Sequence, residues 1–246
     1  MILRANDVSL EGRLNSLSLA LEPGRITAIC GPNGAGKSSL LQCLAGLLRP
    51  DTGSVTLDGA ELQGVHPRER AKAIGYLPQD GEVAWDVAVR TLVALGRLPH
   101  RDRGTAQVDG ALAALDLIAL ADRPVSRLSG GEKARVLLAR VLAGAPRWIL
   151  ADEPLAALDL AHQLSLLAHL RHAADAGVGV VLVLHDLALA MNHAHRVVVL
   201  DRGTKAADGA PEEALSAAIV RQVWGVPARW LGEPGARALV AGRPPA

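Results

Sequence analysis

Residues 31–38, Gly-Pro-Asn-Gly-Ala-Gly-Lys-Ser, constrain the fold of this chain more than any other stretch. They fit the pattern G-x-x-x-x-G-K-[ST] at every fixed position. Residues 25–30 form a short, largely apolar run typical of a buried strand, and residues 39–48 carry apolar side chains at helical spacing. A strand, a glycine-rich loop and a helix in this order present backbone N–H groups and a helix N-terminus to an anion. The stretch therefore predicts a site for the phosphates of a nucleoside triphosphate.

The residue types of this loop indicate how the phosphates are bound. Its glycines lack the Cβ atoms that would block close approach of a phosphate. Lys37 can reach the β- and γ-phosphates, and the Ser38 hydroxyl can ligate Mg²⁺. A glycine-rich turn with a solvated lysine is the alternative, but the fixed pattern and its flanks disfavour it. The residues expected to bind the nucleotide are Gly31, Pro32, Asn33, Gly34, Ala35, Gly36, Lys37, Ser38 and Ser39.

Composition limits both the core and the class of ligand. Half of the 246 residues are hydrophobic, yet the chain has no Phe and one Tyr, so we expect an aliphatic core. Lys and Arg number 26 against 25 for Asp and Glu. This balance argues against nucleic acid as the main ligand, because such proteins usually carry a concentrated basic face. Cys30 and Cys43 form no C-x-x-C pair and are expected to be small buried hydrophobes in a reducing compartment.

Neither a signal peptide nor a membrane-spanning helix is expected. The first residues lack a charged start followed by an apolar core. The longest apolar candidate, residues 178–184, is far shorter than the ~20 residues that a spanning helix needs. Any role at a membrane is therefore expected to depend on a partner.

Hydrophobic patterning predicts an α/β chain with an inserted helical region. Residues 1–24 alternate apolar and polar, which favours antiparallel strands. Apolar residues recur at helical spacing between about 81 and 146. Near-continuous apolar strands at 147–152 and 178–184, separated by a helix, are typical of a parallel sheet covered on both faces. The shorter elements expected are a strand at 54–59, a helix at 67–73, a strand at 74–78, a helix at 158–176, a final strand at 197–203 and a hairpin within 231–246.

Asp152 and Glu153 end one of these apolar strands and precede Pro154. A phosphate loop implies a Mg²⁺ that needs a carboxylate at the end of a neighbouring parallel strand, and Asp152 suits that role. Glu153 can then act as a general base on the attacking water. Solvated loop carboxylates would be the better interpretation of the pair taken alone, but the phosphate loop favours the catalytic one.

Residues 128–133, Leu-Ser-Gly-Gly-Glu-Lys, open another predicted helix. Ser129 and Glu132 form an S-x-x-E capping box, which by itself only starts a helix. Capping does not explain the glycines at positions 130 and 131, which cost roughly 1 kcal/mol each against alanine in a helix. Exposed backbone at a helix N-terminus is a second anion site. Such an arrangement suggests nucleotides held between two copies of the chain.

Together, the motifs occur in the order and spacing of an ATP-binding-cassette ATPase, and the chain resembles that family from roughly residue 3 to residue 230. The resemblance implies a P-loop NTPase with a RecA-like core, an N-terminal antiparallel β-subdomain and an inserted α-helical subdomain. It assigns residues 1–230 to the ATPase domain, about 81–146 to the helical subdomain and 231–246 to a C-terminal hairpin and tail. The motifs that carry it are the phosphate loop, Gln79, residues 128–132, residues 150–154, residues 157–159 and His185.

The resemblance also implies roles for single residues. Gln79 looks like the loop glutamine that senses the γ-phosphate and Mg²⁺. Ser129, Gly130 and Gly131 look like residues that contact the γ-phosphate bound by the opposite subunit, and Asp159 resembles the aspartate that crosses the dimer interface. His185, which alone would more often be a strand-end histidine, looks like the switch histidine at the γ-phosphate. The expected catalytic residues are Glu153, His185 and Gln79, and the expected metal ligands are Ser38, Gln79 and Asp152.

A narrower resemblance concerns residues 93–100, Val-Ala-Leu-Gly-Arg-Leu-Pro-His. The segment is similar to V-x-x-G-R-x-P-H in ATPases of importers for iron–siderophore, haem and cobalamin complexes. The alternative is an ordinary surface helix followed by a turn that ends at Pro99. In such proteins the region equivalent to Asp80–Leu95 helps to form the groove for a cytoplasmic helix of the permease.

The chain departs from the family at two places. Most members stack adenine on an aromatic residue of the N-terminal strands, but residues 1–30 contain no Phe, Tyr, Trp or His. We expect Arg13 or an aliphatic residue to replace the stack, so that ATP and GTP bind alike. Leu155 and Ala156 also replace the usual Thr-Ser after Asp-Glu-Pro, which removes no catalytic group.

The function expected from the sequence is that of the ATP-hydrolysing subunit of an importer for an iron–siderophore, haem or cobalamin complex. The resemblance implies ATP and Mg²⁺ as cofactors, a homodimer, a polytopic permease and, indirectly, a periplasmic or surface substrate-binding protein, but no nucleic acid. It places the chain peripherally at the cytoplasmic face of the plasma membrane. The alternative is a soluble ATPase scaffold of the iron–sulfur cluster assembly type.

Overall fold

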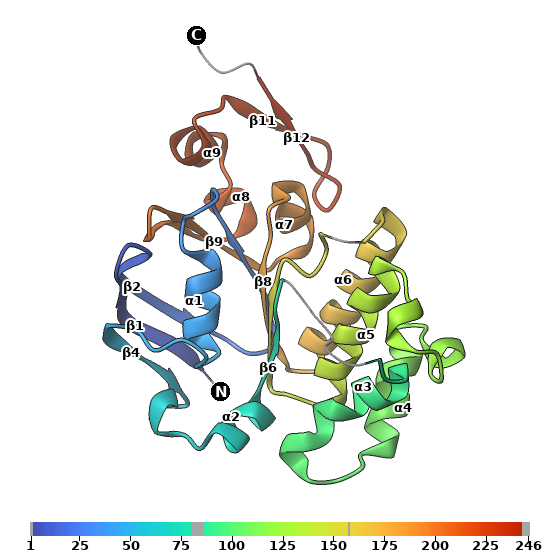
Figure 1. The fold of residues 1–246 in the computed structure, drawn as a ribbon. Coiled ribbons are helices and arrows are strands. Elements are labelled where there is room, and N and C mark those ends of the chain that lie inside the picture. Colours follow the sequence, from blue (N-terminus) through green and yellow to red (C-terminus); the bar gives the residue numbers. More distant parts are fainter. Residues whose placement is uncertain (1, 80–85, 157, 243–246) are drawn as a thin grey trace.

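The apolar runs of the sequence form the centre of a six-stranded sheet (Figure 1). The computed structural model describes residues 2–79, 86–156 and 158–242. Three adjacent strands, β3 (Ile26–Cys30), β8 (Gly179–Val183) and β7 (Trp148–Asp152), are buried at every position, as expected for a sheet covered on both faces. In sheet order the strands are β10 (Thr204–Gly209), β9 (Arg196–Asp201), β3 (Ile26–Cys30), β8 (Gly179–Val183), β7 (Trp148–Asp152) and β6 (Ile74–Leu77). All pairs are parallel except the edge pair of β10 with β9.

An antiparallel sheet covers one face of this parallel sheet, with helix α1 (Lys37–Leu44) between them. Its strands, in order, are β2 (Leu14–Leu21), β1 (Leu3–Leu10), β4 (Thr52–Leu57) and β5 (Ala60–Glu61). Apolar side chains of β1, β2 and α1 share one core cluster with alternate residues of the parallel strands. The antiparallel strands predicted for residues 1–24 are therefore confirmed. Cys30 and Cys43 are both free and buried, as expected, and burial raises the pKa of Cys30 to about 12.

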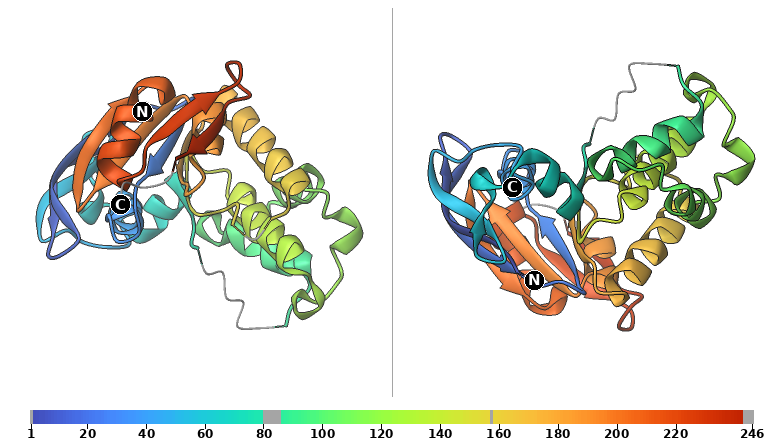
Figure 2. Two further views of the ribbon diagram at one scale, coloured as in Figure 1. Left: turned by 90° about the horizontal axis from the view of Figure 1, so that it is seen from above. Right: turned by 90° about the horizontal axis from the view of Figure 1, so that it is seen from below.

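Helices cover the opposite face of the parallel sheet (Figure 2). The helices within the predicted helical region, about 81–146, pack on one another, since α3 (Val89–Ala94) and α4 (Thr105–Ala114) both contact α5 (Gly130–Ala143). The segments are α3 (Val89–Ala94), η2 (Leu95–His100), α4 (Thr105–Ala114), η3 (Ile118–Leu120), η4 (Val125–Arg127), α5 (Gly130–Ala143), α6 (Leu160–Asp175) and α7 (Leu187–His193). Their apolar faces and the sheet form a second cluster that is almost entirely aliphatic. None of the described helices is both long and apolar enough to cross a bilayer.

The end of the chain differs from the sequence-based expectation. The strand expected at 197–203 is not the last, because β10 follows it and pairs antiparallel at the sheet edge. The hairpin expected within 231–246 begins earlier, with β11 (Ala228–Leu231) paired to β12 (Ala238–Ala241), and residues 243–246 lie outside the described residues. β10 is half-exposed and poor in β-branched residues, so its pattern gives little strand signal. The remaining segments are η1 (Leu62–Gly64), α2 (Pro67–Ala73), α8 (Pro211–Ala214) and α9 (Ala217–Trp224).

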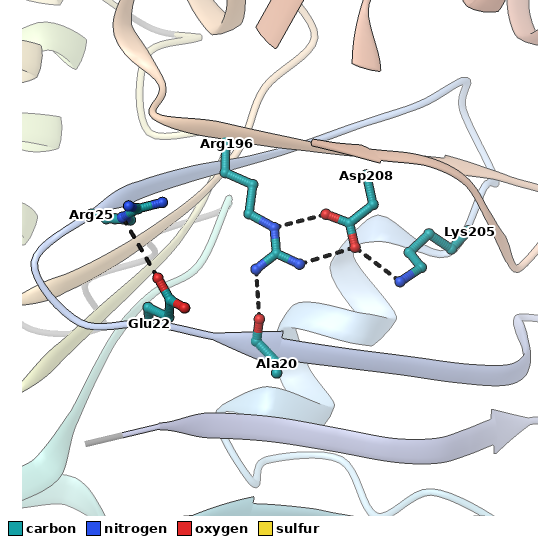
Figure 3. Close-up of polar contacts among 6 residues, drawn as sticks. All are labelled: Ala20, Glu22, Arg25, Arg196, Lys205 and Asp208. Carbon is teal, nitrogen blue, oxygen red and sulfur yellow. Dashed lines mark hydrogen bonds and ion pairs between the residues drawn. The ribbon is translucent and has the colours of Figure 1, made fainter. Parts of the chain in front are cut away.

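A guanidinium group links the two sheets (Figure 3). Arg196 Nε and Nη2 donate to the Asp208 carboxylate at 2.7 and 2.9 Å, and its Nη1 donates to the Ala20 carbonyl of β2 at 2.6 Å. Lys205 donates to the same carboxylate at 2.9 Å. Burial raises the pKa of Asp208, but the hydrogen bonds from Arg196 and Lys205 outweigh it and leave the pKa below its usual value.

We expect Asp208→Asn to lower the free energy of unfolding at pH 7 by about 1–3 kcal/mol, because it weakens charge-assisted hydrogen bonds that are partly shielded from water. Asp208 binds its proton less tightly when folded, so its stabilising contribution is present above the unfolded pKa of about 3.9 and is lost as the pH falls. Urea unfolding at pH 7 and at a series of pH values from about 4 downward, through the folded pKa of Asp208, measures both effects.

Glu22→Gln is the matched control. Glu22 pairs with Arg25 at 3.6 Å in the same region, but both side chains are more than half exposed. An exposed pair contributes about 0–1 kcal/mol, so this variant should stay near wild-type stability. Equal losses for the two variants, or a loss in Asp208→Asn that does not shrink as the pH falls through the folded pKa of Asp208, would contradict the assigned role of the pair.

Candidate functional site

The predicted site residues converge at the carboxyl ends of neighbouring parallel strands. The phosphate loop follows β3, Gln79 follows β6, Glu153 follows β7 and His185 follows β8. Ligands of α/β sheets bind at such an edge. An open cavity of about 760 Å³ lies there. Its lining residues are Gly12, Arg13, Asn33, Gly34, Ala35, Gly36, Lys37, Ser38, Ser39, Gln79, Glu153 and His185.

Two loop glycines are required by the chain's own backbone. Gly31 and Gly36 have φ angles of 153° and 96°. A Cβ on Gly31 would lie 2.3 Å from the Leu200 carbonyl oxygen, and one on Gly36 would lie 2.5 Å from the Arg13 carbonyl oxygen. Close approach to a phosphate was the reason expected from the sequence. The structure adds that these glycines let the loop pack against β9 and against the turn between β1 and β2.

Lys37 is buried at the base of the loop. Its Nζ donates to the carbonyl oxygens of Gly31 and Pro32, each at 2.9 Å. Burial lowers the pKa of Lys37 below its usual value, although the charges of Glu153 and Asp152 partly oppose that shift. The ammonium group therefore lies in a position where phosphate oxygens can replace its carbonyl acceptors and supply a compensating charge.

Asp152 ends β7 and is 3% exposed. Burial raises the pKa of its carboxyl group, while a hydrogen bond with the Ser38 side chain opposes the shift. Its Oδ1 atom is buried and has no hydrogen-bond partner in the part of the chain that the structure describes. A buried carboxylate oxygen without a partner, beside a serine hydroxyl, suits a hard divalent cation. These residues therefore fit the Mg²⁺ that the sequence analysis expected.

Glu153 lies between the other two residues that the sequence analysis named as catalytic. Gln79 Nε2 donates to Glu153 Oε2 at 3.1 Å, and His185 Nε2 forms a short contact with Glu153 Oε1. Glu153 also has a φ angle of 50°, an uncommon backbone conformation for a residue other than glycine. The sequence analysis placed all three residues around the γ-phosphate, but it predicted no direct contact between their side chains. The structure joins three strand ends at a single carboxylate.

The remaining predicted residues lie elsewhere. Ser129 caps α5, with its Oγ accepting from the Glu132 N–H at 3.3 Å and Glu132 Oε2 accepting from the Ser129 N–H at 2.8 Å. Asp159 caps α6 by accepting from the His162 N–H at 2.9 Å. Neither these caps nor the glycines at 130 and 131 line the cavity at the phosphate loop. The single chain therefore does not bring this second group of residues to the first.

Cavity-lining residues at the turn between β1 and β2 were only partly expected. Arg13 was one of the proposed replacements for an aromatic stack, and it does line the cavity. Gly12 also lines it and was not expected. The sequence analysis drew attention to this turn only because residues 1–30 contain no aromatic residue on which a base could stack.

Residues 93–100 have a packing role that their motif did not reveal. Arg97 is 6% exposed, binds Asp102 through Nε at 2.9 Å and Nη2 at 2.6 Å, and donates to the Ala143 carbonyl at 3.2 Å. His100 Nε2 lies 2.9 Å from the Gly144 carbonyl oxygen. These contacts attach η2 to the end of α5. The segment is therefore more than the ordinary surface turn that was the alternative interpretation.

The comparisons with known proteins agree with this geometry. The model of the ABC transporter family matches residues 14–156. This chain belongs to that family. The ABC transporter match includes the phosphate loop, the cap at Ser129 and the acidic pair 152–153.

Relatives of full length extend the likeness beyond the matched region. The Hemin import ATP-binding protein HmuV of Myxococcus xanthus (strain DK1622) is 44% identical over an aligned length of 247 residues, gaps included. The match covers 94% of this chain and 92% of that protein. A solved ABC transporter assigned to the metal-chelate type, in an inward-facing conformation, matches with a TM-score of 0.82 and 25% identity, covering 98% of this chain and 97% of its own. An ATP-binding cassette solved as a dimer with ADP and phosphate matches with a TM-score of 0.75 and 25% identity. The match covers 85% of this chain and 98% of the chain in that structure.

We expect Lys37→Ala to weaken nucleotide binding by about 10- to 100-fold, because charge-assisted hydrogen bonds of about 1.5–3 kcal/mol would be lost. Isothermal titration with ADP and Mg²⁺ measures the change. Lys72→Ala is the control, since Lys72 lies on α2 and pairs with Glu69 away from the cavity. Unchanged affinity in a folded Lys37→Ala protein would exclude this lysine from the phosphate site.

Proposed function

We propose that this chain is the ATP-binding and hydrolysing subunit of an importer that takes up an iron–siderophore, haem or cobalamin complex through a membrane permease. The contact of Glu153 with Gln79 and His185, all three of which line the phosphate-loop cavity, is the observation that carries the ATPase activity. Haem is the favoured cargo, because relatives matching nearly the whole chain are named hemin import proteins. Those names also favour the importer over the iron–sulfur scaffold.

The proposed chemistry follows from the positions of the site residues. The loop backbone and Lys37 bind the phosphates, and Glu153 accepts a proton from the attacking water. Gln79 and His185 hold the Glu153 carboxylate in place until the γ-phosphate arrives. Mg²⁺, when bound, would neutralise charge on the β- and γ-phosphates. The residues that would hold it are Ser38, Gln79 and Asp152.

We further propose that two copies close head to tail on two nucleotides. Gly130 carries the argument: a Cβ there would meet nothing within 4 Å, so the chain's own fold does not require glycine. Glycine in the first turn of α5 nevertheless costs stability. Close approach of a second subunit's γ-phosphate to Ser129, Gly130 and Gly131 would explain its presence. Asp159, exposed at the start of α6, would cross the same interface.

The proposed permease contact lies in the region 80–95. Residues 86–95, which include α3, are described and lie on the helical side of the parallel sheet, whereas 80–85 lie outside the described residues. The chain would act peripherally at the cytoplasmic face of the plasma membrane, and a periplasmic or surface substrate-binding protein would deliver cargo to the permease. Within the chain, we assign 1–230 to the ATPase domain, about 81–146 to its helical subdomain and 231–246 to the C-terminal tail.

Glu153→Gln should bind ATP, hydrolyse it about 10²- to 10⁴-fold more slowly and accumulate as a dimer, because it removes a general base without removing a phosphate contact. Phosphate release and size-exclusion chromatography with ATP and Mg²⁺ measure both effects. Glu69→Gln, which alters an exposed pair on α2, should hydrolyse ATP like the wild type. Wild-type turnover in Glu153→Gln would refute the assigned base.

Tagged Glu153→Gln, incubated with ATP in detergent-solubilised native membranes, should co-purify with a polytopic permease. Mass spectrometry of the captured proteins identifies the partner, and Lys37→Ala under the same conditions controls for capture that does not depend on nucleotide. Recovery of soluble proteins alone would move the assignment to the iron–sulfur scaffold.

A further inference from the structure

The turn between β1 and β2 is held in a fixed position at the edge of the phosphate loop. The Arg13 N–H donates to the Leu10 carbonyl at 2.9 Å, and the Asn15 N–H donates to the Gly203 carbonyl at 2.9 Å. A Cβ on Gly36 would lie 2.5 Å from the Arg13 carbonyl oxygen, and one on Gly203 would lie 2.7 Å from it. The backbone of Arg13 therefore fits between the phosphate loop and the turn that joins β9 to β10.

The side chain of Arg13 is available to a ligand. Arg13 is exposed and lines the nucleotide cavity beside Gly12. Within residues 2–79, 86–156 and 158–242, no hydrogen bond or ion pair involves its guanidinium group, in contrast to the paired guanidinium groups of Arg97 and Arg196. An unpaired, planar cation at the wall of a ligand cavity can bind the face of a π system.

The cavity has two distinct ends. Gln79, Glu153 and His185 lie together at one end, where the proposed hydrolysis takes place. Gly12 and Arg13 belong to the turn between β1 and β2, which packs against Gly36 at the end of the phosphate loop. The antiparallel sheet that carries this turn lies across α1 from β6, the strand that leads to Gln79 (Figure 1). A nucleotide whose terminal phosphate faces Glu153 therefore extends its nucleoside toward Arg13.

The nucleoside end of the cavity lacks a ring on which a base could stack. None of the lining residues is Phe, Tyr or Trp, and the imidazole of His185 contacts Glu153 at the opposite end. Gly12 has no side chain to fill the space beside Arg13. We propose that the Arg13 guanidinium stacks on the face of the nucleotide base and is the main base-binding group of this site. This inference rests on the proposed function, because it takes the ligand of the cavity to be a nucleotide.

Stacking on a face predicts weak base selectivity. Every purine presents a similar π face, whereas the hydrogen-bonding edges of adenine and guanine differ. An arginine that paired with the edge would favour guanine, which offers two acceptors where adenine offers one acceptor and one donor. Arg13 as a stacking group therefore predicts that adenine and guanine nucleotides bind with affinities within about three-fold of each other.

The test measures ADP, GDP and pyrophosphate by competition against a fluorescent ADP labelled on the ribose, with Mg²⁺ present. Diphosphates are used because hydrolysis does not then change the ligand during titration. The variants are Arg13→Ala and Arg13→Tyr. Arg4→Ala is the matched control, because Arg4 is an exposed arginine on β1 that does not line the nucleotide cavity.

Arg13→Ala should bind ADP and GDP about five-fold more weakly, the equivalent of about 1 kcal/mol, and should bind pyrophosphate as the wild type does. Arg13→Tyr should bind both nucleotides at least as well as the wild type, because a ring restores the stack. Unchanged ADP affinity in Arg13→Ala, an equal loss for pyrophosphate, or a wild-type preference above ten-fold for either base would each overturn the assignment.

Wild-type ATP hydrolysis, assayed on the same preparations, separates this inference from the proposed function. A wild-type protein that hydrolyses ATP while Arg13→Ala binds ADP normally would refute the base contact alone. Absence of both nucleotide binding and hydrolysis in the wild type would refute the proposed function and this inference with it.

Discussion

The site depends first on the register of two buried parallel strands. β7 and β8 pair so that Asp152 lies opposite Val183, and the Glu153 N–H continues the ladder to the Val183 carbonyl at 3.2 Å. This register places Glu153 beside His185, two residues beyond the end of β8. A slip of one residue would turn Asp152 away from Ser38, because successive side chains of a strand point to opposite faces. Burial of both faces of the sheet therefore fixes the geometry of the site as well as its stability.

Sequence patterns were most informative where local chemistry decides the structure. The helix expected at 67–73 is found with the same bounds in α2, which starts with Pro67 at its first turn, and the antiparallel strands of residues 1–24 were also correct. Sequence patterns failed where packing between distant segments of the chain decides the local structure. The buried guanidinium of Arg97 and the edge strand β10 owe their positions to Ala143 and to β9, which no local pattern encodes. For the same reason the contacts of Glu153 were not foreseen.

Gly36 and Gly130 both belong to sequence motifs, but the structure gives different reasons for a glycine at each position. Gly36 has a positive φ and no room for a Cβ, so the chain's own fold explains it. A Cβ on Gly130 would meet nothing within 4 Å, so the chain's own packing does not require glycine there, as it does not at Gly110 within α4. A sequence motif does not separate these cases, since it records the residue and not the cause. The open space at Gly130 leaves room for the second copy of the chain in the proposed dimer.

The cap at the start of α5 has a consequence for how Ser129 can bind an anion. Its Oγ acts as an acceptor toward the Glu132 N–H, and its backbone N–H is taken by the Glu132 carboxylate. A hydroxyl group has one proton to donate as well as two lone pairs. The capping box uses a lone pair, and the Ser129 side chain also hydrogen-bonds the Glu132 carboxylate, which lowers the pKa of that carboxyl group. In the proposed dimer, a phosphate that took the Ser129 proton would therefore displace the Glu132 carboxylate, while the Oγ lone pair still accepted from the N–H that starts α5.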